Sequence, residues 1–448
     1  MKKILPTLAL SLASASVLFA GGIENKTNMS TGYLRNPSRN AESSRPEAAF
    51  YNIAGTGFLT DGLYLEAGNQ FIFKEYSNKI ATSLLYKAGI IEGEKYNDET
   101  TVVLYPDFDF VYKHDKLAFL GTFGVYAGGG ELEYSEGTSA TAALFSGGAL
   151  QAQTKAKAAI ASGNAADALK YGAAAKALLA AATNHSLTVT SITYGGQLGL
   201  AYQVNDQLSL AIAERLTYGT QKMKISSPAF TATGDGSDHI SYFADAFALN
   251  TVFGIHMRPT DKLDVGMQFS TKSSLKYHVD KVKGNTIVAA GFDITDKTTW
   301  HTDLAPTFNL GAAYKFTDKL SVSSSFNYYF NKFAKMDSVL SECKYKNSFE
   351  IALGADYDLS EFLTLSAGTA YGHQGVKDDA NNTFNPVLDS VQFAAGLELR
   401  PVKDLTLTAG ATYVDYFTSD YYLNDTYKTK LNKNLFMCSL GATLRLAK

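Results

Sequence analysis

The sequence has few cysteines, no basic excess and, beyond its first residues, no long apolar run. Two cysteines, Cys343 and Cys438, are too few for a disulfide scaffold. The formal net charge of −3 provides no basic surface for nucleic acid, so we exclude nucleic acid as a partner. After Gly21 no apolar run approaches the roughly 20 residues that a membrane-spanning helix needs. The mature chain is therefore not an α-helical membrane protein.

Sequence motifs of enzymes and metal sites are also lacking. There is no serine, histidine and aspartate constellation, no zinc-ligand spacing and no glycine-rich phosphate loop, and the histidines are scattered. Asp107 and Asp109 share one face of an expected strand. We interpret this pair as polar residues facing a lumen rather than as a catalytic pair. We expect no enzymatic activity, no cofactor and no metal.

The first residues have the layout of a secretory signal peptide. A basic start is followed by an apolar stretch over 4–19 and a small-residue junction at Ala20 and Gly21. A retained anchor is disfavoured because the stretch is short for a spanning helix and ends in small residues. We predict that residues 1–20 are a signal peptide removed during export.

Aromatic residues and glycine are abundant, with 27 Tyr, 27 Phe and 37 Gly against one Trp and 9 Pro. Such proportions are typical of a barrel with an apolar outside, a polar inside and aromatic girdles. From residue 63 onward, many segments alternate apolar with polar or small residues. In Leu320–Phe330, for example, Phe326 and Tyr328 fall on one face and Ser325 and Asn327 on the other. This period of two indicates strands rather than helices.

The connections between these segments alternate in length, which distinguishes a membrane barrel from a soluble sandwich. Short turns fall at 113–116, 204–207, 258–262, 316–319, 358–361 and 400–404. Long polar loops fall around 74–99, 128–187, 220–239, 280–303, 331–345, 373–389 and 418–433. Outer-membrane barrels have tight periplasmic turns and long extracellular loops. We predict an all-β fold, a 14-stranded antiparallel transmembrane β-barrel over 62–448 with both ends in the periplasm.

Two segments do not fit the strand pattern. Residues 149–182 are rich in alanine with spaced lysines and an interruption at Ser162 to Asn164, which predicts a helical hairpin inserted in an extracellular loop. It is either a lid that collects apolar molecules or a solvated decoration. Residues 21–61 precede the first strand and are rich in Asn, Ser, Arg and Gly. We predict that they fold into the lumen as a plug, although a free periplasmic segment is an alternative.

Several pieces of the chain match the pattern of a known family. They are Asn36 to Ala41, Ala48 to Gly55, Lys116 to Gly130 and Leu405 to Tyr413, in this order along the chain. Together they resemble the FadL/TodX family of outer-membrane transporters for long-chain fatty acids and other hydrophobic compounds. The likeness extends over essentially the whole mature chain.

The resemblance assigns a hatch motif just ahead of the first strand. The family pattern Tyr-Asn-Pro-Ala-Gly is matched here by Asn52, Ala54 and Gly55, while Ile53 replaces the usual proline. That replacement removes the rigid turn that proline would supply. In the family this hatch lies in the lumen as a plug.

The resemblance also implies sideways release of the ligand through a gap where the third strand kinks near the hatch. Carried over, that strand is Leu117 to Gly130. Its candidate gate residues are Gly121, Gly124, Gly128, Gly129 and Gly130. Glycines in barrel strands also simply relieve crowding, and plain packing is an equal alternative for this run.

If the ligand is a fatty acid, a cation in the lumen should meet its carboxylate. By alternation Arg215 and Lys272 face the lumen and are our candidates. The same alternation places Glu214 on the lipid face, where an acidic group is costly. A β-bulge at this point would turn Glu214 inward.

We therefore expect a protein of the bacterial cell outer membrane that captures hydrophobic small molecules in an apolar lumen pocket and releases them sideways into the bilayer. The alternatives are a general diffusion porin and a structural or adhesive barrel. The expected partners are outer-membrane lipid and lipopolysaccharide, the hydrophobic ligand and the barrel-assembly machinery. We expect a monomer.

Overall fold

The computed structural model describes residues 27–82, 95–232, 235–285, 295–336, 346–376, 381, 383, 385–424 and 427–446. The predicted signal peptide, residues 1–20, and Cys343 lie outside the described residues. None of the helices within these ranges is long and apolar enough to cross a membrane.

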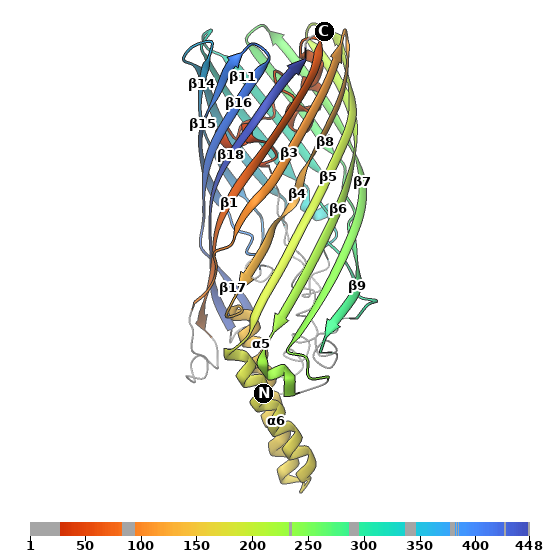
Figure 1. Cartoon of the computed structure of the whole chain (residues 1–448), viewed down its shortest axis with the longest axis vertical. Helices are drawn as coiled ribbons and strands as arrows, with labels where there is room; N and C mark the ends of the chain where they lie inside the picture. Colours follow the sequence, from red (N-terminus) through yellow and green to blue (C-terminus); the bar gives the residue numbers. More distant parts are fainter. Residues whose placement is uncertain are drawn as a thin grey trace.

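Fourteen antiparallel strands form a closed barrel, as the alternation predicted (Figure 1). They are β1 (Gly62–Thr82), β3 (Thr101–His114), β4 (Leu117–Tyr134), β5 (Ser186–Asn205), β6 (Leu208–Ser226), β7 (His239–Thr260), β8 (Leu263–Ser270), β11 (Thr307–Lys315), β12 (Leu320–Tyr329), β13 (Ser348–Asp358), β14 (Leu363–His373), β15 (Ser390–Val402), β16 (Leu405–Tyr416) and β18 (Tyr427–Leu446). The barrel closes because β1 pairs with both β3 and β18. No barrel strand in the described ranges is left with an open edge along its whole length, which the bilayer core requires.

Four shorter strands extend the wall at the end with the long loops. They are β2 (Lys95–Asp98), β9 (Lys276–Gly284), β10 (Thr299–His301) and β17 (Ser419–Asn424). Short 3₁₀ helices at this end are η2 (Pro228–Ala232) and η3 (Asn331–Phe333). The opposite end has the tight turns, and there Leu63 at the start of the barrel pairs with Leu446 at its end. Both ends of the barrel therefore lie on the short-turn, periplasmic side.

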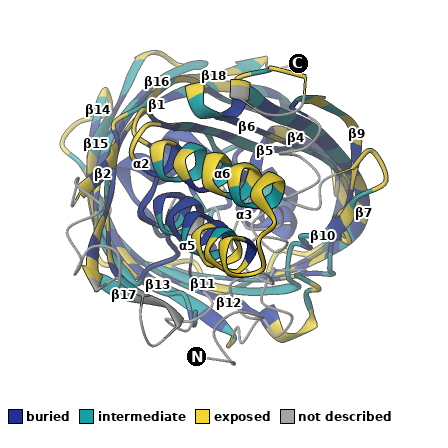
Figure 2. Ribbon diagram, turned by 90° about the horizontal axis from the view of Figure 1, so that it is seen from below, coloured by how far each residue is buried: buried dark blue, intermediate teal, exposed yellow. Residues whose placement is uncertain are grey.

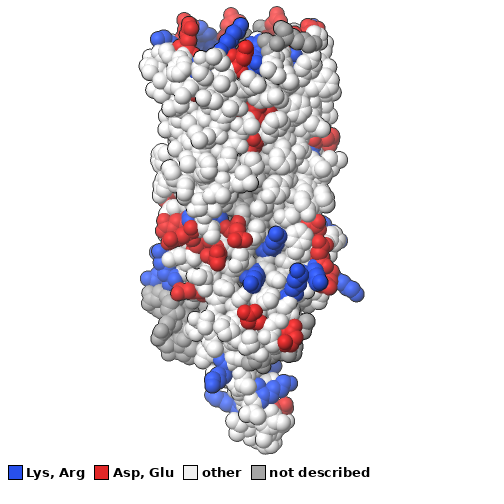
Figure 3. Space-filling model, viewed as in Figure 1, with Lys and Arg blue, Asp and Glu red and all other residues white. Residues whose placement is uncertain are grey.

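Alternating side chains divide the inside of the barrel from the outside. In β12, Ser323, Ser325 and Asn327 are buried, and Phe326 and Tyr328 point the other way. Large apolar residues that are more than half exposed cover the outer face, among them Leu198, Leu216, Phe247, Leu249, Phe393 and Leu440. Figure 3 shows the resulting broad band with few charged residues between two charged zones. This band matches the bilayer's apolar core.

Several strands run further outward than the sequence predicted. β1 continues to Thr82 and β6 to Ser226, although we expected loops from 74 and from 220. The prediction was wrong because strands that leave the bilayer no longer need an apolar outer face. Lys222 and Lys224 on β6 break the alternation of apolarity without breaking the pairing with β7.

The helical insertion consists of α5 (Ser139–Ala161) and α6 (Ala165–Thr183), which project from the extracellular end (Figures 1 and 2). The predicted helical segment began at residue 149, ten residues too late. A capping box between Thr138 and Thr141 starts α5 upstream of the alanine-rich run. Phe145 on the early part of α5 is buried, and its ring contacts His185 and Phe230.

The N-terminal segment packs against strands on different sides of the barrel interior. It contains α2 (Thr31–Arg35), α3 (Ala48–Tyr51) and the 3₁₀ helix η1 (Ile53–Phe58). α2 contacts β15 and β16, while η1 contacts β5 to β8 on the other side of the lumen. Gly410 allows the close approach of α2, because a methyl group there would lie 2.7 Å from the Arg35 nitrogen. We call residues 27–61 the hatch.

Candidate functional site

The predicted hatch residues lie together in one buried turn. Asn52 Nδ2 donates to the Glu42 carbonyl at 2.9 Å and lies 2.7 Å from His256 Nδ1 on β7. Ala54 is completely buried. A methyl group at Gly55 would lie 2.3 Å from the Glu42 carbonyl oxygen, so this position needs glycine. The motif therefore folds the hatch back on itself and fixes it to the wall.

Two glutamines of the barrel wall, which no sequence motif marks, hold the hatch backbone. Gln268 on β8 accepts from the Ile53 amide at 3.1 Å and donates to the Phe50 carbonyl at 3.0 Å. Gln197 on β5 donates to the Ala49 carbonyl at 2.7 Å. Both face the lumen by strand alternation, but their partners could not be read from the pattern.

A buried ionic network attaches the other half of the hatch. Arg35 lies 2.5 Å from Asp356 and 2.6 Å from Glu398. Arg39 lies 2.7 Å from Glu42, within the hatch. Such pairs fix position more than they add stability, because their desolvation offsets much of the attraction. The sequence offered arginines before the first strand and acids facing the lumen, but not their pairing.

A cavity lies between the hatch and the wall, with a volume of about 1230 Å³ that includes space continuous with solvent. Six aromatic side chains line it: Tyr33, Phe50, Tyr51, Tyr126, Tyr277 and Tyr329. Serine, threonine, asparagine and glutamine side chains line much of the remainder. The predicted apolar pocket is therefore a mixed one, in which aromatic faces alternate with hydroxyl and amide groups.

Arg215 faces this cavity from β6. Its Nε donates to Gln197 at 3.0 Å, and its guanidinium lies 4.7 Å from the Tyr126 ring centre and 5.4 Å from that of Phe50. No acidic side chain of the described ranges forms an ion pair with it. Cation–π contacts and a hydrogen bond to an amide oxygen thus stabilise the guanidinium charge. An anion in the cavity could still form an ion pair with it.

Lys272, the second candidate, already has a partner. Its Nζ lies 3.2 Å from Asp303, whose side chain is fully buried. Asp303 also lines the cavity. The two predicted cations are therefore not equivalent: Arg215 lines the cavity without an ion pair to a described residue, whereas Lys272 is paired with Asp303.

β4 leaves regular pairing at its glycine run. The ladder between β3 and β4 extends from His114 and Leu117 to Phe108 and Phe123 and no further. Beyond it, the register between β4 and β5 shifts twice, at 125–127 and at 128–130. Figure 1 shows β4 continuing toward the extracellular end. The wall between β3 and β4 thus lacks a backbone ladder next to the hatch.

The five predicted gate glycines fall into three environments. Gly121 lies within the ladder, where a methyl group would collide with Phe110, and Gly124 faces Met29 of the hatch. Gly128 and Gly130 both have φ of +83°, which side chains rarely adopt, while Gly129 has nothing within 4 Å of a methyl group. Only Gly128 to Gly130 form the irregular part of the strand.

The cavity reaches this irregular part. Tyr126, Ala127 and Gly128 line it, and a second cavity is lined by Gly129 and Lys74. Thr27 and Tyr33 of the hatch line both cavities. Both cavities therefore reach the irregular part of β4 and share two hatch residues in their lining.

Side chains bridge the unpaired edges of β3 and β4. Tyr105 on β3 donates from its hydroxyl to the Val125 carbonyl at 3.0 Å. Thr100 Oγ1 donates to the Glu131 carbonyl at 2.8 Å. Side-chain bonds of this kind can open by rotamer change, whereas a strand ladder opens only by moving the backbone.

Glu214 stays on the outer face. It is exposed and its carboxylate accepts from Thr251 Oγ1 at 2.7 Å. The pairing of β6 with β5 and with β7 shows no register shift near this position, so the alternative of an inward-turning bulge is wrong. The acid is partly satisfied by a threonine on the neighbouring strand instead.

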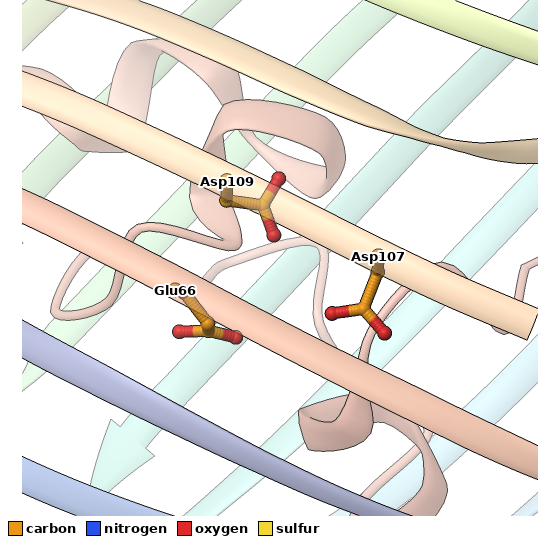
Figure 4. A group of neighbouring side chains, drawn as sticks. All are labelled: Glu66, Asp107 and Asp109. Carbon is orange, nitrogen blue, oxygen red and sulfur yellow. The ribbon is translucent and has the colours of Figure 1, made fainter.

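A cluster of carboxylates lies on the lumen side of β1 and β3. Glu66 pairs in register with Asp109, and Asp107 lies two residues along the same face. Figure 4 shows the three carboxyl groups turned toward a common space. One oxygen from each lies within 4.8 Å of the others, and all three residues are buried. The sequence placed Asp107 and Asp109 together but could not place Glu66 opposite them.

The chain is similar in sequence to known outer-membrane proteins. Residues 168–441 match the family model described as outer membrane protein transport protein (OMPP1/FadL/TodX). Outer membrane protein P1 of Haemophilus influenzae is 29% identical over 114 residues, which is 23% of this chain and 25% of that protein. A 47 kDa outer membrane protein of Pasteurella multocida is 26% identical over 125 residues, 26% of this chain and 29% of that protein. The chain thus spans about a quarter of the length of these relatives.

Solved structures share the whole fold at low sequence identity. A Pseudomonas aeruginosa FadL homologue has a TM-score of 0.66 at 16% identity, covering 95% of this chain and 99% of that one. The Pseudomonas putida toluene transporter TodX has a TM-score of 0.60 at 14% identity, covering 95% and 100%. With the family model matching more than half of its residues, this chain belongs to the OMPP1/FadL/TodX family of outer-membrane transport proteins.

Proposed function

We propose that this protein takes up hydrophobic small molecules across the outer membrane and that its preferred ligands carry a carboxylate, as long-chain fatty acids do. The observation that carries the proposal is Arg215, a buried cation that lines the lumen cavity without an ion-pair partner among the described residues. A ligand carboxylate would supply that partner, and the aromatic faces around it would contact an apolar chain. Aromatic hydrocarbons, which lack the acid, are the alternative ligand class.

Release of the ligand is proposed to be sideways, through the wall between β3 and β4. An apolar molecule gains nothing by entering water in the periplasm, but it gains by moving directly into the bilayer. The end of the β3 and β4 ladder, the bulges of β4 and the two cavities lined by Gly128 and by Gly129 support this route. The hatch closes the direct path.

Ligand binding tests the role of Arg215. The full chain in lipid nanodiscs should bind oleic acid more tightly than oleyl alcohol, by about 10- to 100-fold, since a hydrogen bond to a charged group contributes about 1.5–3 kcal/mol. Arg215→Gln should remove this preference. Lys272→Gln is the matched control, because Lys272 is already paired with Asp303, and it should keep the preference. Equal affinity of the unaltered chain for acid and alcohol would contradict the proposal.

A general porin is the competing function, and it requires an open lumen. In planar bilayers we expect low small-ion conductance from the full chain and a large increase after deletion of residues 21–58. Unchanged conductance after this deletion would mean that the hatch does not plug the barrel.

We further propose that the protein works as a monomer, inserted by the barrel-assembly machinery and surrounded by lipid and lipopolysaccharide. Exposed large apolar side chains lie on strands all along the chain, β5, β7, β15 and β18 among them, so lipid can surround a single barrel, which supports this arrangement. We propose no catalytic role. Mass measurement in nanodiscs would show one chain per particle.

A further inference from the structure

The carboxylates of Glu66, Asp107 and Asp109 are buried side by side, and no cation of the described residues forms an ion pair with them. Their exposed fractions are 6%, 4% and 1%. No lysine, arginine or histidine within the described ranges forms an ion pair with any of the three, although the neighbouring arginines of the hatch each have acidic partners. Unpaired charges in such a place cost several kcal/mol each, so something else must offset them.

Hydrogen bonds do not satisfy the group. Among the described residues, the oxygens of Asp107 and Asp109 accept no hydrogen bond of good geometry, although the side chains of Gln70 and Thr122 lie close to them. Glu66 accepts one hydrogen bond, from Thr443 Oγ1 at 2.8 Å. The nearby Gln70 is occupied by the hatch, since its amide exchanges hydrogen bonds with Asn28. Directly opposed like charges on neighbouring strands, as at Glu66 and Asp109, are themselves destabilising.

A hydroxyl from the hatch independently marks the same place. Thr31 is 2% exposed, and its Oγ1 also lacks a hydrogen-bond partner. A methyl group added at Gly68 would lie 2.5 Å from Thr31 Oγ1 and 2.7 Å from an Asp107 carboxylate oxygen. The unpartnered hydroxyl and the unpartnered carboxylate therefore face one small space, one from the plug and one from the wall.

From these contacts we infer that Glu66, Asp107, Asp109 and Thr31 form a binding site for a calcium ion that fastens the hatch to the barrel wall. Ca²⁺ binds oxygen ligands at 2.3–2.6 Å, so ligand oxygens on opposite sides of it lie about 5 Å apart. The three carboxylate oxygens lie within 4.8 Å of one another, which fits this span. The donors are all oxygen, with no nitrogen or sulfur, as hard cations require.

Calcium fits the site better than magnesium does. Mg²⁺ usually keeps several waters and takes one or two carboxylates, whereas Ca²⁺ accepts cages built by the protein from several carboxylates. Here three carboxylates and a hydroxyl converge under the hatch. A doubly charged ion would offset most of their charge and would turn mutual repulsion into attraction.

The position of the site links it to the opening in the wall. Asp107 is the first residue of β3 beyond the ladder with β4, which ends at Phe108 and Phe123. An ion held there would join β1, β3 and the start of α2 beside the unpaired edge. Loss of the ion would let the acids repel one another and would loosen the hatch at this place.

Calorimetric titration of the full chain in detergent tests the site. After treatment with EDTA and its removal, CaCl₂ at about pH 7.5 should bind at one ion per chain with a Kd between about 1 μM and 1 mM, the range of sensor and extracellular sites. The double variant Asp107→Asn, Asp109→Asn should bind calcium more than about 100-fold more weakly. Such a loss exceeds the roughly 10- to 100-fold loss that is typical when only a group supporting the metal ligands is removed. Glu350→Gln is the matched control. This half-buried lumen acid already accepts hydrogen bonds from Asn327 and Thr27, so calcium binding should be unchanged.

Two results would overturn the inference: no saturable binding by the unaltered chain, or the same binding by the double variant. Protons would then be what neutralises the acids. Should the double variant fail to fold, Thr31→Val removes only the hydroxyl and should weaken binding several-fold in a folded barrel. In the unaltered chain calcium should also raise the unfolding temperature, and a temperature equal in calcium and in EDTA would likewise overturn the inference.

Discussion

Gly128 provides a sharp test of the bulge in β4. Its φ of +83° lies in the left-handed region, which costs other residues about 1–2 kcal/mol on backbone grounds alone. A methyl group there would also lie 2.1 Å from the Ser191 carbonyl oxygen on β5. Gly128→Ala must therefore shift β4 away from β5 or abandon the bulge, with a total loss of about 2 kcal/mol or more.

Gly129→Ala is the matched control, because a methyl group at Gly129 meets nothing within 4 Å. Its effect on unfolding should stay within about 0.5 kcal/mol, as for surface substitutions. The assay has two readouts on both variants: urea unfolding in lipid and uptake of labelled oleate by cells. Gly128→Ala should lose stability and most of the uptake, and Gly129→Ala should lose neither. Equal behaviour of the two variants would refute the reasoning.

Three further predictions concern other parts of the molecule. Burial lowers the pKa of His185 from 6.5 to about 4. Near pH 5 the imidazole therefore binds a proton in the unfolded state but not in the folded state. The base of the helical hairpin should consequently be less stable by about 2 kcal/mol at pH 5 than at pH 8. Hydrogen exchange at the start of α5 measures this, and His185→Asn should abolish the dependence. Glu214→Leu combined with Thr251→Val should stabilise the barrel in lipid by about 1–2 kcal/mol in urea unfolding, because it removes a charge from the lipid face; a loss of stability would contradict this. Replacing 154–172, the distal and largely exposed part of the hairpin, by a short linker should leave oleate uptake within about twofold, as for other surface changes far from a binding site; a loss of uptake would mean that the distal helices collect ligand.

Much of the fold could be predicted because each barrel strand carries its own signal. In β12, Ser325 and Asn327 alternate with Phe326 and Tyr328. This alternation alone predicts that the aromatic side chains face lipid. The alternation of short and long connections then sets the strand number and the end at which both termini of the barrel lie. These are local properties of the sequence, and the structure confirms the fold they predict.

The site was less predictable because it depends on contacts between distant parts of the chain. Arg35 meets Asp356, Arg215 meets Gln197, and Glu66 faces Asp109 only once register is set. Strand alternation gives the side on which each residue points, but not the neighbour that it meets across the lumen. The sequence identified Arg215 as a lumen cation. The structure was needed to show that no acid of the described ranges pairs with it and that Lys272 pairs with Asp303.

Uptake of labelled oleate tests the central claim most directly. The assay uses cells that lack a fatty-acid transporter of their own. One strain expresses the unaltered protein, a second expresses the Arg215→Gln variant, and a third expresses neither. We predict saturable oleate uptake by the unaltered chain, strongly reduced for Arg215→Gln, with no rise in the uptake of a small sugar. Sugar uptake without saturable oleate uptake would contradict the account and would identify the barrel as a general porin.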